Sequence, residues 1–146
     1  MTDATLLETQ LMEQQRAETV SRAKAGIWAG RIMGSLAVLF LLMDSAMKFW
    51  MPSPVIEGTA RVGWPVSLIP VLGIVLLACT ILYIVPRTAI VGAVLLTGYL
   101  GGAVATHLRI RDPLFSHVLF PTYLGVLLWA GLYLRDRRLH TVLRAS

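Results

Sequence analysis

An acid and a base lie one helical turn apart within an apolar stretch of the chain. Asp44 precedes Lys48 by four residues, the order and spacing in which two such side chains reach each other best on a helix. If this stretch crosses a membrane, an ionised Asp44 is costly without a partner, and ionisable groups at that depth are functional candidates by default. The alternative is a structural ion pair that fixes the helix in a bundle. Both interpretations predict an intrahelical pair.

Three further polar side chains can join this pair. His107 closes one apolar stretch, Arg109 follows it, and His117 opens the next stretch. Stretches that cross a membrane alternately bring all five residues to the same level, where we expect them to line or adjoin a small polar pocket. In this pocket Lys48 and His107 donate hydrogen bonds to a ligand carbonyl, while Asp44 keeps the lysine charged. A structural polar cluster without a ligand is the alternative.

Metal and thiol chemistry find little support in the sequence. Two histidines separated by a loop lack the regular spacing of a zinc site, and a haem needs axial ligands on facing helices. Cys79 is the single cysteine, which excludes an intrachain disulfide, a CxxC pair and a four-cysteine zinc site. We therefore predict no metal site. No phosphate loop, nucleophile elbow or zincin motif occurs either, so no catalytic residue is assigned and enzymatic activity stays an open question.

The composition is that of a membrane protein. Of the 146 residues, 56% are hydrophobic and 14% are charged, whereas soluble domains carry roughly 25% charged residues. A hydrocarbon core of about 30 Å needs about 20 helical residues. Three segments of that length or slightly longer contain no Asp, Glu, Lys or Arg: residues 62–86, 88–106 and 113–134.

Short connections between the apolar segments predict how they pack. Only a tight turn at Pro86 and Arg87 separates the second span from the third, and short loops make sequential helices antiparallel. Pro70 removes a backbone donor inside the second span, so we expect a bend there. The predicted fold is all-α, a transmembrane up-down-up-down four-helix bundle with spans at about residues 28–50, 65–85, 88–107 and 114–134.

The termini form two polar segments around this bundle. Residues 1–26 are predicted to be either a helix lying at the membrane surface or a disordered tail, since Leu7, Leu11 and Val20 give only a weak apolar side. The bundle then occupies residues 27–138, and residues 139–146 form a short basic tail.

The basic residues set the orientation. The chain has a formal net charge of +5, and its Lys and Arg residues lie at the span ends and in the termini, which leaves no basic surface for nucleic acid and favours contacts with lipid headgroups. The side opposite the termini carries only Lys48, Arg61, Arg109 and Arg111. We therefore expect a protein of the cytoplasmic (inner) membrane with both termini in the cytoplasm, because the terminal side carries Arg16, Arg22, Lys24, Arg31, Arg87, Arg135, Arg137, Arg138 and Arg144.

Small residues recur at four-residue spacing in the third span, a pattern typical of close helix packing. We expect Gly98, Gly101, Gly102 and Ala105 to pack against other helices, with the chain's own bundle favoured over another copy or a ligand. Gly30 and Gly34 form a single GxxxG in the first span, which is weak evidence of dimerisation because the pattern is frequent by chance in apolar helices.

From residue 31 to residue 138 the order of these features resembles the DoxX-like family of small four-span membrane proteins. The matching features are the charged end of the first span, the Gly63-Trp64-Pro65 entry to the second, Pro86-Arg87 at the turn, and the stretch from Gly98 to His107. In many relatives a glycine stands at the position of Asp44, so an acidic role is not carried over to that residue.

The resemblance implies a fold and a location first, and an activity by analogy only. Some relatives are similar to subunits of a membrane thiosulfate:quinone oxidoreductase, and others are linked to oxidative-stress assemblies. The expectation is a quinone-linked or redox-associated membrane component, with a quinone headgroup or a similar small polar ligand in the polar pocket. The alternative is a non-catalytic accessory subunit that docks to other membrane protein subunits.

Overall fold

The structure is a computed structural model, and it describes residues 2–136, 138–139 and 141. Most of the basic tail expected at residues 139–146 therefore lies outside the described residues. The helical elements are α1 (Thr2–Trp50), α2 (Ser53–Arg61), the 3-10 turn η1 (Val66–Leu68), α3 (Ile69–Ile84), α4 (Ala89–Arg109), the single π-helical turn η2 (Leu114–Val118) and α5 (Phe120–Arg135).

The predicted all-α fold is confirmed. Among the described residues, four helical segments are long and apolar enough to cross a membrane: Leu7–Trp50, Val66–Ile84, Ala89–Arg109 and Leu114–Arg135. The first and last contain the expected spans, and the other two agree with them to within two residues at each end. Large apolar side chains also cover the outside of the bundle at mid-span, among them Leu39, Ile74, Val94 and Val126, each at least half exposed. Such a surface suits lipid rather than water.

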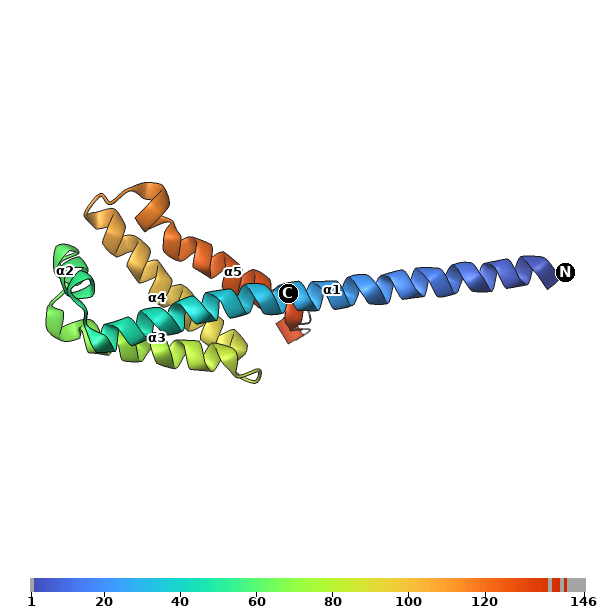
Figure 1. Ribbon diagram of the computed structural model, residues 1–146, viewed down its shortest axis with the longest axis horizontal. Helices are drawn as coiled ribbons and strands as arrows, with labels where there is room; N and C mark the ends of the chain where they lie inside the picture. Colours follow the sequence, from blue (N-terminus) through green and yellow to red (C-terminus); the bar gives the residue numbers. More distant parts are fainter. Residues whose placement is uncertain (1, 137, 140, 142–146) are drawn as a thin grey trace.

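The helices pack as a ring in which α1 contacts α3 and α5, and α4 closes the ring by contacting the same two helices (Figure 1). The inner stripe of α1 is formed by residues 30, 34, 37, 41 and 45, which recur every three or four positions and therefore lie on one helix face. Apolar side chains from the other three helices meet this stripe and form the core, including Leu76, Tyr83, Leu96, Leu128 and Leu132.

The N-terminal polar segment is helical and continuous with the first span. It is the first half of α1, and it extends well beyond the bundle in Figure 1. From residue 7 to residue 25 the side chains are exposed on all sides of the helix. The structure agrees with the helical alternative rather than with the disordered tail. That this helix continues unbroken into the first span is a feature the sequence did not predict.

Prolines mark where helices begin rather than where they bend. Pro70 falls in the first turn of α3, after the 3-10 turn η1, so the expected bend inside the second span is replaced by a change of helix type before it. Pro121 likewise falls in the first turn of α5, after the π turn η2. The first turn tolerates proline because its backbone N–H has no partner within the helix.

Close helix contacts occur at glycines of α1, α4 and α5. A Cβ added to Gly131 would lie 2.8 Å from the backbone nitrogen of Gly34, and one added to Gly30 would lie 2.9 Å from the carbonyl oxygen of Gly131. At Gly92 an added Cβ would lie 2.3 Å from the backbone nitrogen of Tyr83. The GxxxG pair of the first span thus packs α1 against α5 of the same chain.

The glycine stripe of α4 behaves differently from the prediction. A Cβ at Gly98, Gly101 or Gly102 would meet no atom within 4 Å, and Ala105 is exposed. The expected close packing of this stripe within the chain's own bundle is therefore wrong at these glycines. The physical reason is that small residues permit close approach without enforcing it, and here they border hollows.

Candidate functional site

A cavity of about 470 Å³ lies at the end of the bundle that carries α2. All four long helices contribute to its wall, and Thr59 and Val62 of the α2 segment cover one side. Most of the wall is apolar, with an edge-to-face pair of Phe40 and Phe120 whose ring centroids are 5.0 Å apart. Gly98 and Gly102 line the α4 side, and their lack of side chains leaves room for a ligand.

Two predicted residues of α1 form a charged patch in this wall. Lys48 Nζ lies 2.5 Å from Asp44 Oδ2, so the predicted intrahelical pair forms, and both residues line the cavity. Only 16% of the Lys48 side chain is exposed, compared with 35% of Asp44. The pair gives an apolar cavity one cationic donor and one acidic acceptor.

Two loops at this end are built with the same helix-ending motif. After α2, the Gly63 N–H bonds the Ala60 carbonyl and the Trp64 N–H bonds the Thr59 carbonyl, with Gly63 in the left-handed region at φ 81°. This pattern of two backbone bonds around a left-handed residue is the Schellman motif. Pro65 follows and prevents the helix from continuing.

The end of α4 repeats this motif with an arginine in the left-handed position. The Arg111 N–H bonds the Leu108 carbonyl and the Asp112 N–H bonds the His107 carbonyl, with Arg111 at φ 57°. Pro113 then follows, as Pro65 does after α2. The motif places the side chain of Asp112 beside the ring of His107, one turn earlier in α4.

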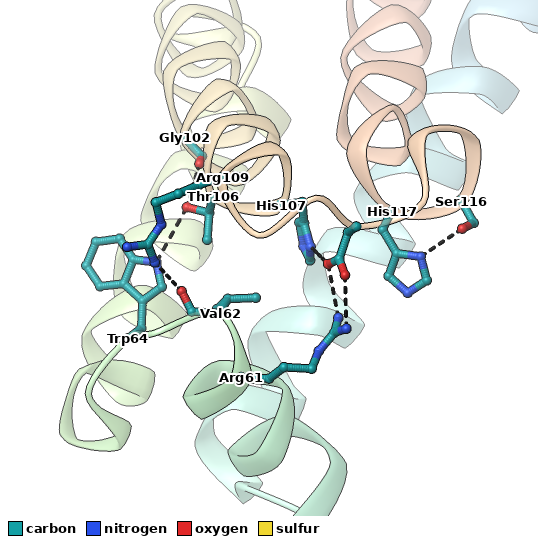
Figure 2. Close-up of polar contacts among 10 residues, drawn as sticks. Arg61, Val62, Trp64, Gly102, Thr106, His107, Arg109, Ser116 and His117 are labelled. Atoms are coloured by element: carbon teal, nitrogen blue, oxygen red, sulfur yellow. Dashed lines mark hydrogen bonds and ion pairs between the residues drawn. The ribbon is translucent and has the colours of Figure 1, made fainter.

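Asp112 connects the two loops and the cavity wall, and Figure 2 labels its two partners, His107 and Arg61. Its carboxylate accepts two hydrogen bonds from the Arg61 guanidinium, at 2.9 and 3.0 Å, and lies 2.6 Å from His107 Nδ1. The Asp112 side chain is only 5% exposed, whereas that of Arg61 is 55% exposed. Since His107 lines the cavity, this carboxylate ties a cavity residue to the α2 helix that covers the cavity.

The electrostatic setting keeps Asp112 ionised. The hydrogen bond from His107 and the adjacent Arg61 guanidinium together hold the pKa of Asp112 below its ordinary value, against the opposing effect of partial burial. An ionised carboxylate in a bidentate contact with a guanidinium accepts hydrogen bonds and donates none.

A second arginine also joins these two loops. Arg61 reaches from α2 to the loop after α4, whereas Arg109 reaches from α4 to the loop after α2. Arg109 Nη2 donates a hydrogen bond to the carbonyl oxygen of Val62, the residue that ends α2, and the guanidinium lies against Gly63. Trp64 Nε1 lies 3.5 Å from Thr106 Oγ1 on α4 (Figure 2). Through these contacts α2 is fastened to α4 on both sides.

The predicted polar residues are thus brought to one end of the bundle but not into one pocket. Asp44, Lys48 and His107 line the cavity. The His117 ring centroid is 6.0 Å from that of His107, and its Nδ1 lies 2.8 Å from Ser116 Oγ, but His117 is not part of the cavity wall. Arg109 borders a separate, outer hollow beside Trp64.

Sequence reasoning missed Arg61, Asp112 and Tyr99 as site residues. Tyr99 lines the cavity from α4. Arg61 and Asp112 are 51 positions apart, so no local spacing announces their contact. One pattern in the sequence does point to this contact. Gly63-Trp64-Pro65 and Arg111-Asp112-Pro113 are both typical of a helix end, and both lie on the same side of the bundle. Arg61 precedes the first and Asp112 lies in the second, so an ion pair between the two loops can be expected.

Comparison with known proteins agrees with this architecture. A profile of the DoxX-like family matches residues 32–131. The chain belongs to the DoxX-like family. Searches of curated proteins and of solved structures return no match to this DoxX-like chain.

The range matched by the family profile, residues 32–131, includes the site. It contains every residue that lines the cavity of this DoxX-like protein, together with Arg61 and Asp112. It leaves out the projecting half of α1. The cavity therefore lies wholly within the family domain, in a membrane-embedded protein, and the N-terminal helix lies outside it.

Proposed function

We propose that this DoxX-like membrane protein binds a quinone in the cavity and acts as a quinone-linked component of membrane redox metabolism. The observation that carries the proposal is the cavity itself, a mostly apolar space of about 470 Å³ with Asp44, Lys48 and His107 in its wall. Ligand pockets of roughly 300–1,000 Å³ typically combine an apolar lining with a few placed polar groups. A quinone headgroup has this chemistry, a flat apolar ring with two oxygens.

A neighbouring hollow offers room for the apolar tail of such a ligand. It has a volume of about 310 Å³, lies between α4 and α5, and includes Gly101 and Gly125 in its wall. Leu100 and Pro121 border both hollows, so the two hollows adjoin at these side chains. A tail that passes them would lie on the outer face of the bundle, where lipid chains pack.

The proposal includes an orientation. With the terminal side in the cytoplasm of the inner membrane, the cavity and its α2 cover lie at the opposite surface, and the excess of basic residues on the terminal side supports this. Single cysteines introduced into residues 53–61 of a Cys79→Ser background are expected to react with an impermeant maleimide from outside the cytoplasm. Labelling from the cytoplasmic side alone would reverse the orientation.

Quinone retention tests the binding proposal. Protein purified in mild detergent is expected to carry quinone that organic extraction and mass spectrometry detect. His107→Phe removes a polar group from the cavity wall and is expected to abolish retention of the reduced, quinol form of the ligand, whereas His117→Phe, a matched change 6.0 Å away and outside the wall, is expected to keep it. Equal retention by both folded variants would contradict the proposal.

A role as an accessory subunit of a larger membrane complex is the second candidate. It is favoured by the first half of α1, whose side chains from residue 7 to residue 25 are exposed outside the bundle. Deletion of residues 2–24 is expected to release any co-purifying membrane protein while the bundle remains folded. Complexes that survive this deletion would argue against the role.

A further inference from the structure

The two ring nitrogens of His107 have different surroundings. Nδ1 lies 2.6 Å from Asp112 Oδ2. Among the residues that the structure describes, no hydrogen-bond partner is found for Nε2. The ring lines the cavity, so Nε2 is the atom of this side chain left for a ligand.

Asp112 decides which nitrogen carries the hydrogen. Both of its carboxylate oxygens accept hydrogen bonds from Arg61, at 2.9 and 3.0 Å, a bidentate contact that favours the ionised acid. An ionised carboxylate can only accept, so the 2.6 Å contact requires the hydrogen on Nδ1. A neutral imidazole with its hydrogen on Nδ1 has a lone pair on Nε2.

We propose that Asp112, as a positioning residue, fixes His107 as a hydrogen-bond acceptor and thereby makes the cavity prefer the hydroxyl-bearing quinol over the quinone. This inference rests on the proposed function. It replaces the sequence-based expectation that His107 donates to a ligand carbonyl. A quinol hydroxyl donates to the Nε2 lone pair, whereas a quinone carbonyl, which has only lone pairs, meets another lone pair there. Lys48 can donate to an oxygen of either form and does not discriminate.

Paired affinities of one ligand in its two redox states test this preference. The probes are decylubiquinone and decylubiquinol, titrated anaerobically at pH 8 into the full-length protein in detergent micelles. The quinol forms one hydrogen bond to Nε2 that the quinone cannot form. We therefore expect the dissociation constant of the quinol to be about tenfold lower than that of the quinone.

Asp112→Asn is the decisive variant. The new amide can accept from Arg61 through its oxygen and donate to Nδ1 through its nitrogen, which moves the ring hydrogen to Nε2. The ratio is then expected to invert in favour of the quinone. Arg61→Gln is the matched control, because it also weakens the contact between α2 and residue 112 but keeps the carboxylate beside Nδ1. The quinol preference is expected to survive in this control.

A second measurement reads the position of the ring hydrogen in the unmodified protein. Nitrogen-15 NMR of histidine-labelled protein at pH 8 distinguishes a protonated Nδ1 from a protonated Nε2, and His107→Gln identifies the signal. A hydrogen on Nδ1 with a bare Nε2 supports the inference, while a hydrogen on Nε2 or on both nitrogens overturns it.

The outcomes separate the two proposals. Equal binding of both redox forms, or an unchanged ratio in folded Asp112→Asn protein, overturns the quinol preference and leaves quinone binding in place. Binding of neither probe overturns the proposed function and the ligand preference together, whatever the NMR signal of His107.

Discussion

The two ends of the bundle are packed in opposite ways. At the end near the termini, Gly30, Gly34 and Gly131 bring the α1 and α5 backbones together, and a Cβ added to Gly30 or Gly131 would collide with backbone atoms of the other helix. At the end covered by α2, Gly98 and Gly102 face empty space in the cavity wall. The same residue type therefore closes one end and opens the other.

Polar groups follow the same division. At the closed end, Tyr83 is fully buried, its hydroxyl donates to the Leu128 carbonyl at 2.8 Å, and the Arg135 guanidinium lies 4.7 Å from its ring centroid. At the open end, Asp44 and Lys48 line a cavity. The comparison indicates that the closed end holds the helices together, so the open end can keep a hollow without a collapse of the fold.

The largest expected effect is at the closed end. Gly131→Leu forces a side chain against the backbone of Gly34, so the unfolding temperature in detergent should fall by several degrees or the fold should be lost, since overpacking costs about 1–3 kcal/mol and sometimes more. Gly102→Leu, the matched change at the open end, should leave the unfolding temperature nearly unchanged but reduce quinone retention. Similar destabilisation by both changes would refute the contrast.

Removal of one hydroxyl group at the closed end should have a smaller effect on stability. Tyr83→Phe removes the hydroxyl that bonds the Leu128 carbonyl and should lower the free energy of unfolding by about 1 kcal/mol. Denaturant titration of the purified protein measures this. Tyr123→Phe, a change on a side chain that is 46% exposed, serves as the comparison and should have less effect. A larger loss at Tyr123 would contradict the placement of Tyr83 at the anchoring end.

At the open end, replacing a glycine that has no close neighbour by alanine should raise the free energy of unfolding. Gly98→Ala meets no atom within 4 Å and gives α4 a better helix former, so a gain of about 0.5–1 kcal/mol is expected. Gly92→Ala, the same change on the same helix, should destabilise because its Cβ would lie 2.3 Å from the Tyr83 nitrogen. Relative to the native chain, the unfolding temperature should rise for Gly98→Ala and fall for Gly92→Ala, and changes in the same direction would contradict the contrast.

The smallest effect concerns the fastening of α2. Because the folded pKa of Asp112 is lowered, its contact with Arg61 stabilises the fold above the ordinary carboxyl pKa of 3.8 and loses this effect as the pH falls below that value. The difference in unfolding temperature between the native chain and Arg61→Gln should therefore be small and positive at pH 7 and should vanish near pH 2. A difference that persists at low pH would mean that Arg61 acts without Asp112.

The sequence was a good guide to what depends on composition and local spacing. Segments without charges predict the spans, and the four-residue spacing of Asp44 and Lys48 predicts their ion pair, which forms. The antiparallel order of α4 and α5 predicts that His107 and His117 lie at the same end of the bundle, and their ring centroids are 6.0 Å apart there. These features need only the length of a span and the periodicity of a helix.

Features that depend on how separate segments meet were not predictable in the same way. Gly30 and Gly98 look alike in sequence, yet one touches α5 and the other faces a cavity, since a small residue does not determine its neighbour. Asp112 reaches Arg61 only because two Schellman motifs turn both loops toward each other. Pro70 was expected to bend a helix, but its place in the first turn depends on where α3 begins.

The uninterrupted length of α1 makes it a lever. At 1.5 Å per residue, the part from residue 2 to residue 26 is about 37 Å long and continues the axis of the first span. A tilt of about 5° at the point where Gly30 crosses Gly131 would therefore displace the tip by about 4 Å, while Asp44, on the short arm, moves by roughly half as much in the opposite direction. Small rearrangements around the cavity would thus be amplified at the far end of the molecule.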